Sequence, residues 1–111
     1  MIYLNDVGLE QAPFEYLRRA VDGGVIRVSP SWPRKYPEGR VPQELIDRYK
    51  KEGYESYAAT GKAGTVLVFD DKIIHKGNYA KQGFRDVLVL QLEPALFRKK
   101  KYIDPRYTFS F

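Results

Sequence analysis

The chain has 111 residues, with a single histidine and no cysteine. This length fits one domain with a modest hydrophobic core. The absence of cysteine excludes disulfides, thiolate metal sites and cysteine nucleophiles, and one histidine cannot complete a site that needs two. The net charge of +5 is compatible with an anionic partner, and an aromatic content of 14% is typical of a β-rich fold.

The apolar runs are too short for a membrane span, which needs about 20 residues. The first residues lack the basic region and cleavage site of a secretory signal, so we expect a cytoplasmic protein. The tail at 94–111 carries a basic run at 98–101 among aromatic residues. Such a run more commonly forms a solvated face than a contact with nucleic acid or a membrane surface. Nucleic acid is therefore not an expected partner.

The N-terminal part of the sequence predicts short elements and a loop. Residues 2–7 are predicted as a strand that must pair with a later segment. Apolar residues at helical spacing, followed by two glycines, predict a short helix over 13–21, although the same stretch could be extended. A strand is predicted at 25–28, and the prolines of 29–40 predict a loop.

The second part predicts one helix and then strands. Pro at the first helical position, an acidic first turn and a basic last turn predict a helix at 42–52. Apolar runs predict strands at 65–69, 72–75 and 84–93, with the turn Asp70-Asp71 between the first two. The runs at 65–69 and 84–93 are nearly continuous in apolar residues, which predicts burial, on both faces in the case of 84–93.

Two polar residues stand beside these C-terminal strands. His75 ends one strand, where it could join a functional site or be a half-buried histidine bonded to the backbone. Arg85 begins the last strand, and burying a cation there is costly unless an anion pairs with it. A guanidinium binds a carboxylate in a bidentate fork, so the expected partner is a carboxylate from a ligand or from the protein. The protein candidates are Asp70, Asp71 and Asp86.

Several motifs follow one another in order. They are GTVLVFD at 64–70, IHKG at 74–77 and Arg85 at the head of an apolar strand, preceded by YLNDV at 3–7 and APFEY at 12–16. In order and spacing these motifs resemble the C-terminal half of the Fe(II)/2-oxoglutarate-dependent oxygenases, nearest to the phytanoyl-CoA dioxygenase-like group. The resemblance covers most of residues 2–93.

The resemblance implies a mainly β fold, a double-stranded β-helix (jelly-roll, cupin-like) truncated at its N-terminus. It implies that His75 is a ligand of Fe(II) and that Arg85 binds the far carboxylate of 2-oxoglutarate. It implies extended backbone at 13–16, in place of the helix. It also implies a single partial domain over 1–111 with a loop and helix insertion at 29–60 above the barrel mouth.

The sequence also departs from that family. Members carry a His-x-Asp motif just before the strand that 2–7 matches, and their metal site uses two histidines and one carboxylate. His75 is the only histidine of the chain. We therefore expect a fragment of a longer oxygenase, a degenerate relative that has lost iron, or a site completed by another chain. In each case this chain alone is expected to lack oxygenase activity.

Other residues are candidates for contacts with ligands. Tyr3 and Asn5 share a face of the first predicted strand and are candidates for lining the barrel and binding the cosubstrate. Trp32 and Tyr36 in the proline-rich loop are candidates for substrate binding, or else pin the loop to the barrel. The pair Asp70-Asp71 could ligate a metal but is more typical of a plain turn.

Three functions follow from these patterns. The first is descent from an oxygenase that hydroxylates a small or lipid-like substrate. The second is a binding module that holds a carboxylate ligand at Arg85 without chemistry. The third is an interaction module, because the strand edges of an incomplete barrel are templates for pairing with a second copy or a partner chain.

Overall fold

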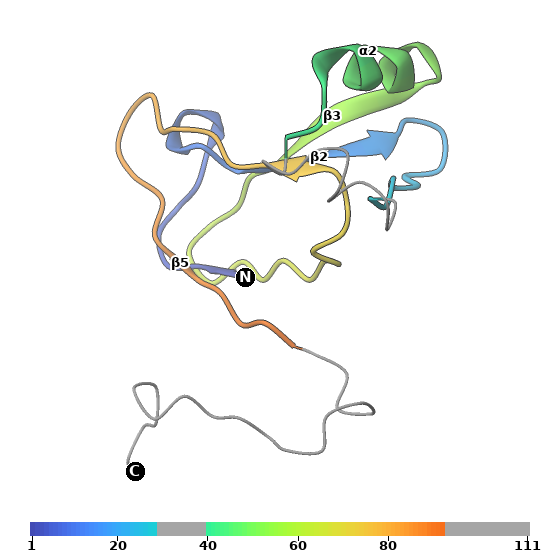
Figure 1. Cartoon of the computed structure of the whole chain (residues 1–111). Helices are drawn as coiled ribbons and strands as arrows, with labels where there is room; N and C mark the ends of the chain where they lie inside the picture. Colours follow the sequence, from blue (N-terminus) through green and yellow to red (C-terminus); the bar gives the residue numbers. More distant parts are fainter. Residues whose placement is uncertain (29–39, 93–111) are drawn as a thin grey trace.

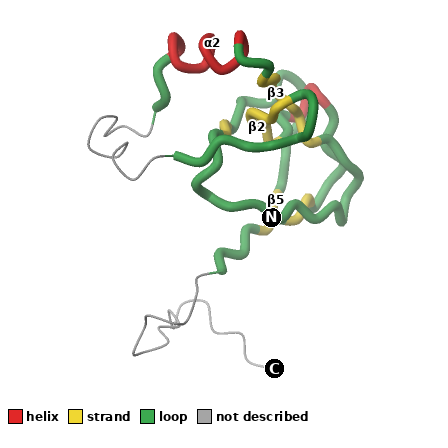
Figure 2. The backbone as a smooth tube through the Cα atoms, turned by 90° about the vertical axis from the view of Figure 1, so that its right-hand side faces the viewer, coloured by secondary structure: helices red, strands yellow, loops and turns green. Residues whose placement is uncertain are grey.

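The computed structural model describes residues 1–28 and 40–92. The predicted loop residues Trp32 and Tyr36, and the tail at 94–111, lie outside this part. The described residues form a three-stranded sheet, a two-stranded sheet and one α-helix, joined by long loops (Figures 1 and 2). A mainly β fold is therefore confirmed.

The central strand of the larger sheet is β2 (Phe14–Arg19), with β3 (Tyr54–Ala59) on one side and β4 (His75–Lys76) on the other. Both neighbours run antiparallel to β2. The helix predicted over 13–21 is wrong, and the alternative of extended backbone at 13–16 is confirmed. Phe14 and Leu17 are each 5% exposed although strand alternation puts them on opposite faces. Burial of both faces produced the apolar spacing that imitates a helix.

The helix predicted at 42–52 is confirmed as α2 (Gln43–Lys51), which lies against β3 (Figure 1). Pro42 precedes its first turn, where the fixed φ of proline costs nothing. Gly53 follows the helix at φ 90°, a conformation that favours glycine, and its N–H donates to the Lys50 carbonyl. Tyr49 packs edge-on against Tyr54 of β3, which holds the helix on the sheet.

The smaller sheet joins the two ends of the described chain. In it β1 (Ile2–Tyr3) pairs antiparallel with β5 (Val87–Leu88), and Ile2 also forms an isolated bridge with Val66. A short 3-10 turn, η1 (Leu9–Gln11), follows and leads into β2. The prediction that the N-terminal strand pairs with later segments is confirmed, although the strand is shorter than 2–7.

The other strand predictions were too long. Residues 25–28 pair only through single bridges at Val25 and Arg27, and 72–75 is a strand only from His75 onward. The predicted burial of the whole runs 65–69 and 84–93 is wrong for the described residues: Leu67 and Phe69 are half-buried, but Val68 is 92% exposed and Leu92 is 91% exposed. Continuous apolar sequence leads to burial only where another layer covers it.

The core lies under the larger sheet. Phe14, Ala59 and Ile73 form its buried centre, and the half-buried Leu67 and Phe69 pack against them from the 65–69 segment. Buried and exposed side chains therefore alternate in that segment: Leu67 and Phe69 face the core, whereas Val66 and Val68 are exposed. Figure 2 shows β2 and β3 next to α2, and β5 farther from the helix, beside the N-terminus.

Candidate functional site

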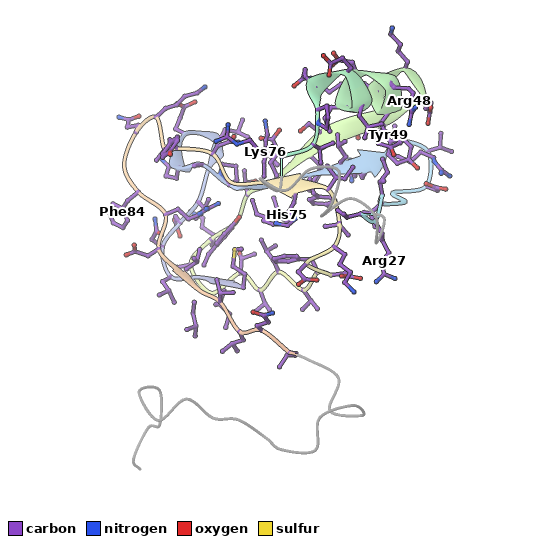
Figure 3. All side chains as sticks on the ribbon, viewed as in Figure 1. Arg27, Arg48, Tyr49, His75, Lys76 and Phe84 are labelled. Carbon is purple, nitrogen blue, oxygen red and sulfur yellow. The ribbon has the colours of Figure 1, made fainter. Side chains whose placement is uncertain are left out.

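His75 lies on the aromatic face of the larger sheet. In β4 it pairs with Tyr16, and its ring stacks on Phe14 with 5.2 Å between centroids, while Phe69 lies 5.9 Å away. The next residue, Lys76, points to the opposite face, as alternation requires (Figure 3). The edge strand thus separates an imidazole on one face from an ammonium group on the other.

The backbone sets the orientation of the His75 ring. Its Nδ1 lies 2.8 Å from the Ile73 carbonyl oxygen. A carbonyl only accepts, so Nδ1 carries the hydrogen of this bond, and in the tautomer with a single N–H the lone pair is on Nε2. Bonding of His75 to the backbone is confirmed, although the residue is exposed and not half-buried. The same bond is the one that metal-ligating histidines use to present the other nitrogen. The two interpretations of His75 are therefore compatible.

Arg85 bonds to backbone and not to a carboxylate in the described part of the chain. Its Nη1 donates to the Ala12 carbonyl at 2.5 Å. The suggested ion pairs with Asp70, Asp71 or Asp86 do not form, and Asp70 pairs instead with Arg27 at 2.6 Å. A Cβ built on Gly77 would lie 3.8 Å from Nη2 of Arg85. The guanidinium therefore lies beside the backbone that follows His75.

These contacts bring the two predicted residues to one end of β2. Arg85 binds the carbonyl of Ala12, two residues before the strand begins, and His75 stacks on Phe14, its first residue. In sequence the two side chains are ten positions apart, and the turn through Gly77 returns the chain to the same region. His75 and Arg85 therefore lie near the same end of β2, although they belong to different segments.

Tyr3 and Asn5 contact backbone, each in a different way. Tyr3 is completely buried, and its hydroxyl donates to the Ala59 carbonyl at 2.6 Å and accepts from the Phe14 N–H at 3.0 Å. Asn5 is half-buried and bonds to the segment that carries Arg85. Tyr3 therefore serves the core, while Asn5 lies next to the candidate site.

Glu15 is a residue that the sequence did not single out. It lies on the face of β2 opposite Phe14, where its carboxylate accepts from Ser56 of β3, from Lys76 at 3.2 Å and from Asn78 at 2.7 Å. Burial raises the pKa of Glu15, but these hydrogen bonds outweigh it and the net pKa is lowered. Alternation within the APFEY motif was the signal that could have placed Glu15 opposite Phe14.

The described residues do not form a complete metal site. Within 1–28 and 40–92, no three His, Cys, Asp or Glu side chains gather as ligands. Asp70 accepts from the Lys72 N–H and pairs with Arg27, and these two contacts hold its pKa below the usual range. This is the turn geometry expected of the Asp70-Asp71 pair. An iron site with two histidines does not fit a chain whose only histidine is His75.

Comparison of the chain with protein-family models, curated proteins and solved structures returns no match. Among the described residues, the one α-helix is too short and too polar to cross a membrane.

Proposed function

We propose that this chain is a non-catalytic relative of the Fe(II)/2-oxoglutarate oxygenases that binds a small dicarboxylate of the 2-oxoglutarate type through Arg85. The observation that carries the proposal is the placement of Arg85 and His75 at the same end of β2. By resemblance to the oxygenases, Arg85 corresponds to the arginine that binds 2-oxoglutarate, and His75 corresponds to one of the metal ligands. Their proximity is what a shared ligand would need.

The surroundings of Arg85 favour an anionic ligand. The residue is half-buried, and none of the ion pairs of the described residues involves it. A partly desolvated guanidinium without a carboxylate partner attracts an anion more strongly than an exposed arginine does. The bond from Nη1 to Ala12 uses one of five N–H donors and orients the planar group. A carboxylate can then be held by the remaining donors in a bidentate fork.

The missing ligands limit the chemistry. With one histidine among these residues, a facial triad would need ligands from outside the given sequence. His75 could contribute Nε2 to such a site or to a polar group of the ligand, because Nδ1 is committed to Ile73. We therefore propose no oxidation by this chain alone. The barrel closure, the small or lipid-like substrate and the contacts of Trp32 and Tyr36 with it stay predictions.

Titration calorimetry with 2-oxoglutarate in metal-free buffer tests the proposal. We expect binding heat for the wild type, none for Arg85→Ala, and at least about tenfold weaker binding for Arg85→Lys, which keeps the charge but loses the fork. Arg27→Ala is the matched control, since it removes one arginine that is already paired with Asp70. Absence of heat with the wild type, or equal heat with Arg85→Ala, overturns the proposal.

A second assay checks the non-catalytic part. We expect no succinate when the purified chain is incubated with Fe(II), ascorbate, oxygen and 2-oxoglutarate, because one histidine does not hold iron in a productive geometry. Succinate production that disappears in His75→Ala would show that the chain is an enzyme.

A second candidate function is an interaction module. Apolar side chains of the segments around β5 and Val66 are exposed: Val66, Val68, Leu88, Val89, Leu90 and Leu92. In the sheet β5 has β1 as its only strand neighbour among the described residues, which leaves its outer edge available. An exposed apolar edge of this kind favours pairing with another chain. A second copy of this chain is the partner we propose.

A further inference from the structure

The ladder between β1 and β5 does not stop where the strands end. The last strand pair joins Tyr3 to Val87, and the Leu4 N–H then donates to the Asp86 carbonyl at 2.9 Å. The chain bends at Leu4 and Asn5. In a regular antiparallel ladder Asn5 would face Arg85 without backbone hydrogen bonds, and the next pair of bonds would join the Asp86 N–H to Leu4 and the Phe84 carbonyl to Asp6.

The side chain of Asn5 makes that next pair. Its Nδ2 donates to the Phe84 carbonyl at 2.9 Å, and its Oδ1 accepts from the Asp86 N–H at 2.8 Å. A carboxamide has the donor and acceptor of a peptide group, so it can replace one in a ladder. The two bonds lie on either side of Arg85. Asn5 thus clamps the backbone immediately before and after the arginine.

A second contact fixes the other end of the arginine. The guanidinium is held by the bond from Nη1 to the Ala12 carbonyl, at the start of β2. Between this anchor and the Asn5 clamp, the aliphatic part of the side chain is fixed at both ends. The clamp depends on a donor and an acceptor at fixed positions, which an aliphatic or acidic residue does not provide.

We propose that Asn5 is a positioning residue, which aligns the Arg85 guanidinium for a carboxylate ligand without touching the ligand itself. The inference rests on the proposed function for the identity of the ligand. The alignment of the guanidinium, however, can be measured in the ligand-free protein. Removing the amide should let the segment around Arg85 move and should weaken carboxylate binding by about tenfold, the usual effect of losing one or two hydrogen bonds.

The test uses the ¹⁵N-labelled full chain. The Arg85 Nε–H resonance is assigned by its loss in Arg85→Lys. We expect Asn5→Ala to shift this resonance toward the position of unrestrained arginines and to weaken 2-oxoglutarate binding in calorimetry. Gln11→Ala is the matched control, because its amide also bonds to backbone, at Gly8 and Gln82, but does not flank Arg85. The control should leave the resonance in place.

Asn5→Asp is a second variant for the same measurement, in case Asn5→Ala does not fold. At neutral pH the introduced carboxylate accepts from Asp86 N–H but repels the Phe84 carbonyl, so the Arg85 resonance should be displaced. Below about pH 4 the protonated carboxyl can donate again, and the resonance should return toward its wild-type position. The carboxyl groups of Asp6 and Asp86 lie close to Asn5 in sequence or across the ladder, so the wild type is recorded over the same pH series as a control. A resonance that is unchanged, or that stays displaced at low pH, overturns the proposal.

The two proposals fail separately. If the wild type gives no heat with 2-oxoglutarate while the Asn5 variants still displace the Arg85 resonance, the ligand assignment fails and the positioning role stands. If the wild type and Asn5→Ala bind 2-oxoglutarate equally well, the positioning role fails and the proposed function stands.

Discussion

At the scale of single residues, the hydroxyl of Tyr3 connects elements that are far apart in sequence. It bonds to the Phe14 N–H at the start of β2 and to the Ala59 carbonyl at the end of β3. Phe14 and Ala59 face each other in the sheet. The single hydroxyl of Tyr3 therefore forms hydrogen bonds with a backbone group of each strand. Buried backbone groups without a partner are costly, and here a side chain supplies the partner.

Tyr3→Phe should therefore lower the free energy of unfolding by about 2 kcal/mol, because it leaves a buried N–H and a buried carbonyl without this hydroxyl. Urea denaturation followed by circular dichroism measures the change. Tyr79→Phe is the control: Tyr79 is 99% exposed, and its loss of a hydroxyl should change stability by less than about 0.5 kcal/mol. Equal effects of the two variants would contradict the role given to Tyr3.

At the scale of elements, β4 is a two-residue strand whose place at the edge of the sheet needs support from side chains. Glu15 of the central strand gives this support on the face opposite Phe14, through Lys76 of β4 and Asn78 just beyond it. The same carboxylate also bonds to Ser56 of β3. One acidic residue therefore links all three strands, and it holds β4 in the register that places His75 on the aromatic face.

This arrangement predicts a pH dependence of stability. The pKa of Glu15 is lowered in the folded state from an ordinary value of 4.5, so its contribution is present above that value and is lost as the pH falls through the folded-state pKa. Between about pH 5 and pH 3 the urea midpoint of the wild type should fall more steeply than that of Glu15→Gln. Glu10→Gln, an exposed change at a residue that forms none of the ion pairs of the described residues, should keep the wild-type slope. Parallel curves for the wild type and Glu15→Gln would contradict this role of Glu15.

At the scale of the whole molecule, the distribution of apolar surface is uneven. The larger sheet has a buried centre in Phe14, Ala59 and Ile73, whereas the run 87–92 beside β1 is largely exposed and carries no charge. An uncharged run can approach its own copy without like-charge repulsion, even in a chain with a net charge of +5. Antiparallel pairing of two such edges would form a symmetric interface.

We therefore expect sedimentation to show a dimer at micromolar concentration. The double change Leu90→Lys and Leu92→Lys should convert it to a monomer, because it places charges on the pairing edge. Val21→Lys is the control, since Val21 is equally exposed at 92% but lies in the turn after β2. If the wild type stays monomeric at all concentrations tested, the proposal that this chain is an interaction module that pairs with its own copy is wrong.

Local chemistry was enough to predict several features of this protein. Proline, an acidic first turn and a basic last turn predicted α2 to within a residue at each end, because the effects of the first proline and of the helix dipole act within one turn. The turn at Asp70-Asp71 followed from the same kind of short-range bonding. Bonding of His75 to the backbone was one of the two alternatives stated for it. The roles of His75 and Arg85 in a site came from the family resemblance and stay predictions.

Pairing and burial depend on residues distant in the chain, and these only the tertiary structure decided. Phe14 and Leu17 have helical spacing, yet β3 and β4 draw them into a strand, because pairing on both sides outweighs a weak local preference. The apolar run at 84–93 predicted burial, yet in the described residues no layer covers Leu90 and Leu92. The sequence by itself determined which groups are present and which short turns they favour. The fold determined that Arg85 meets Ala12 and that Asn5 clamps the chain around it, because contacts across more than 70 residues have no local signal.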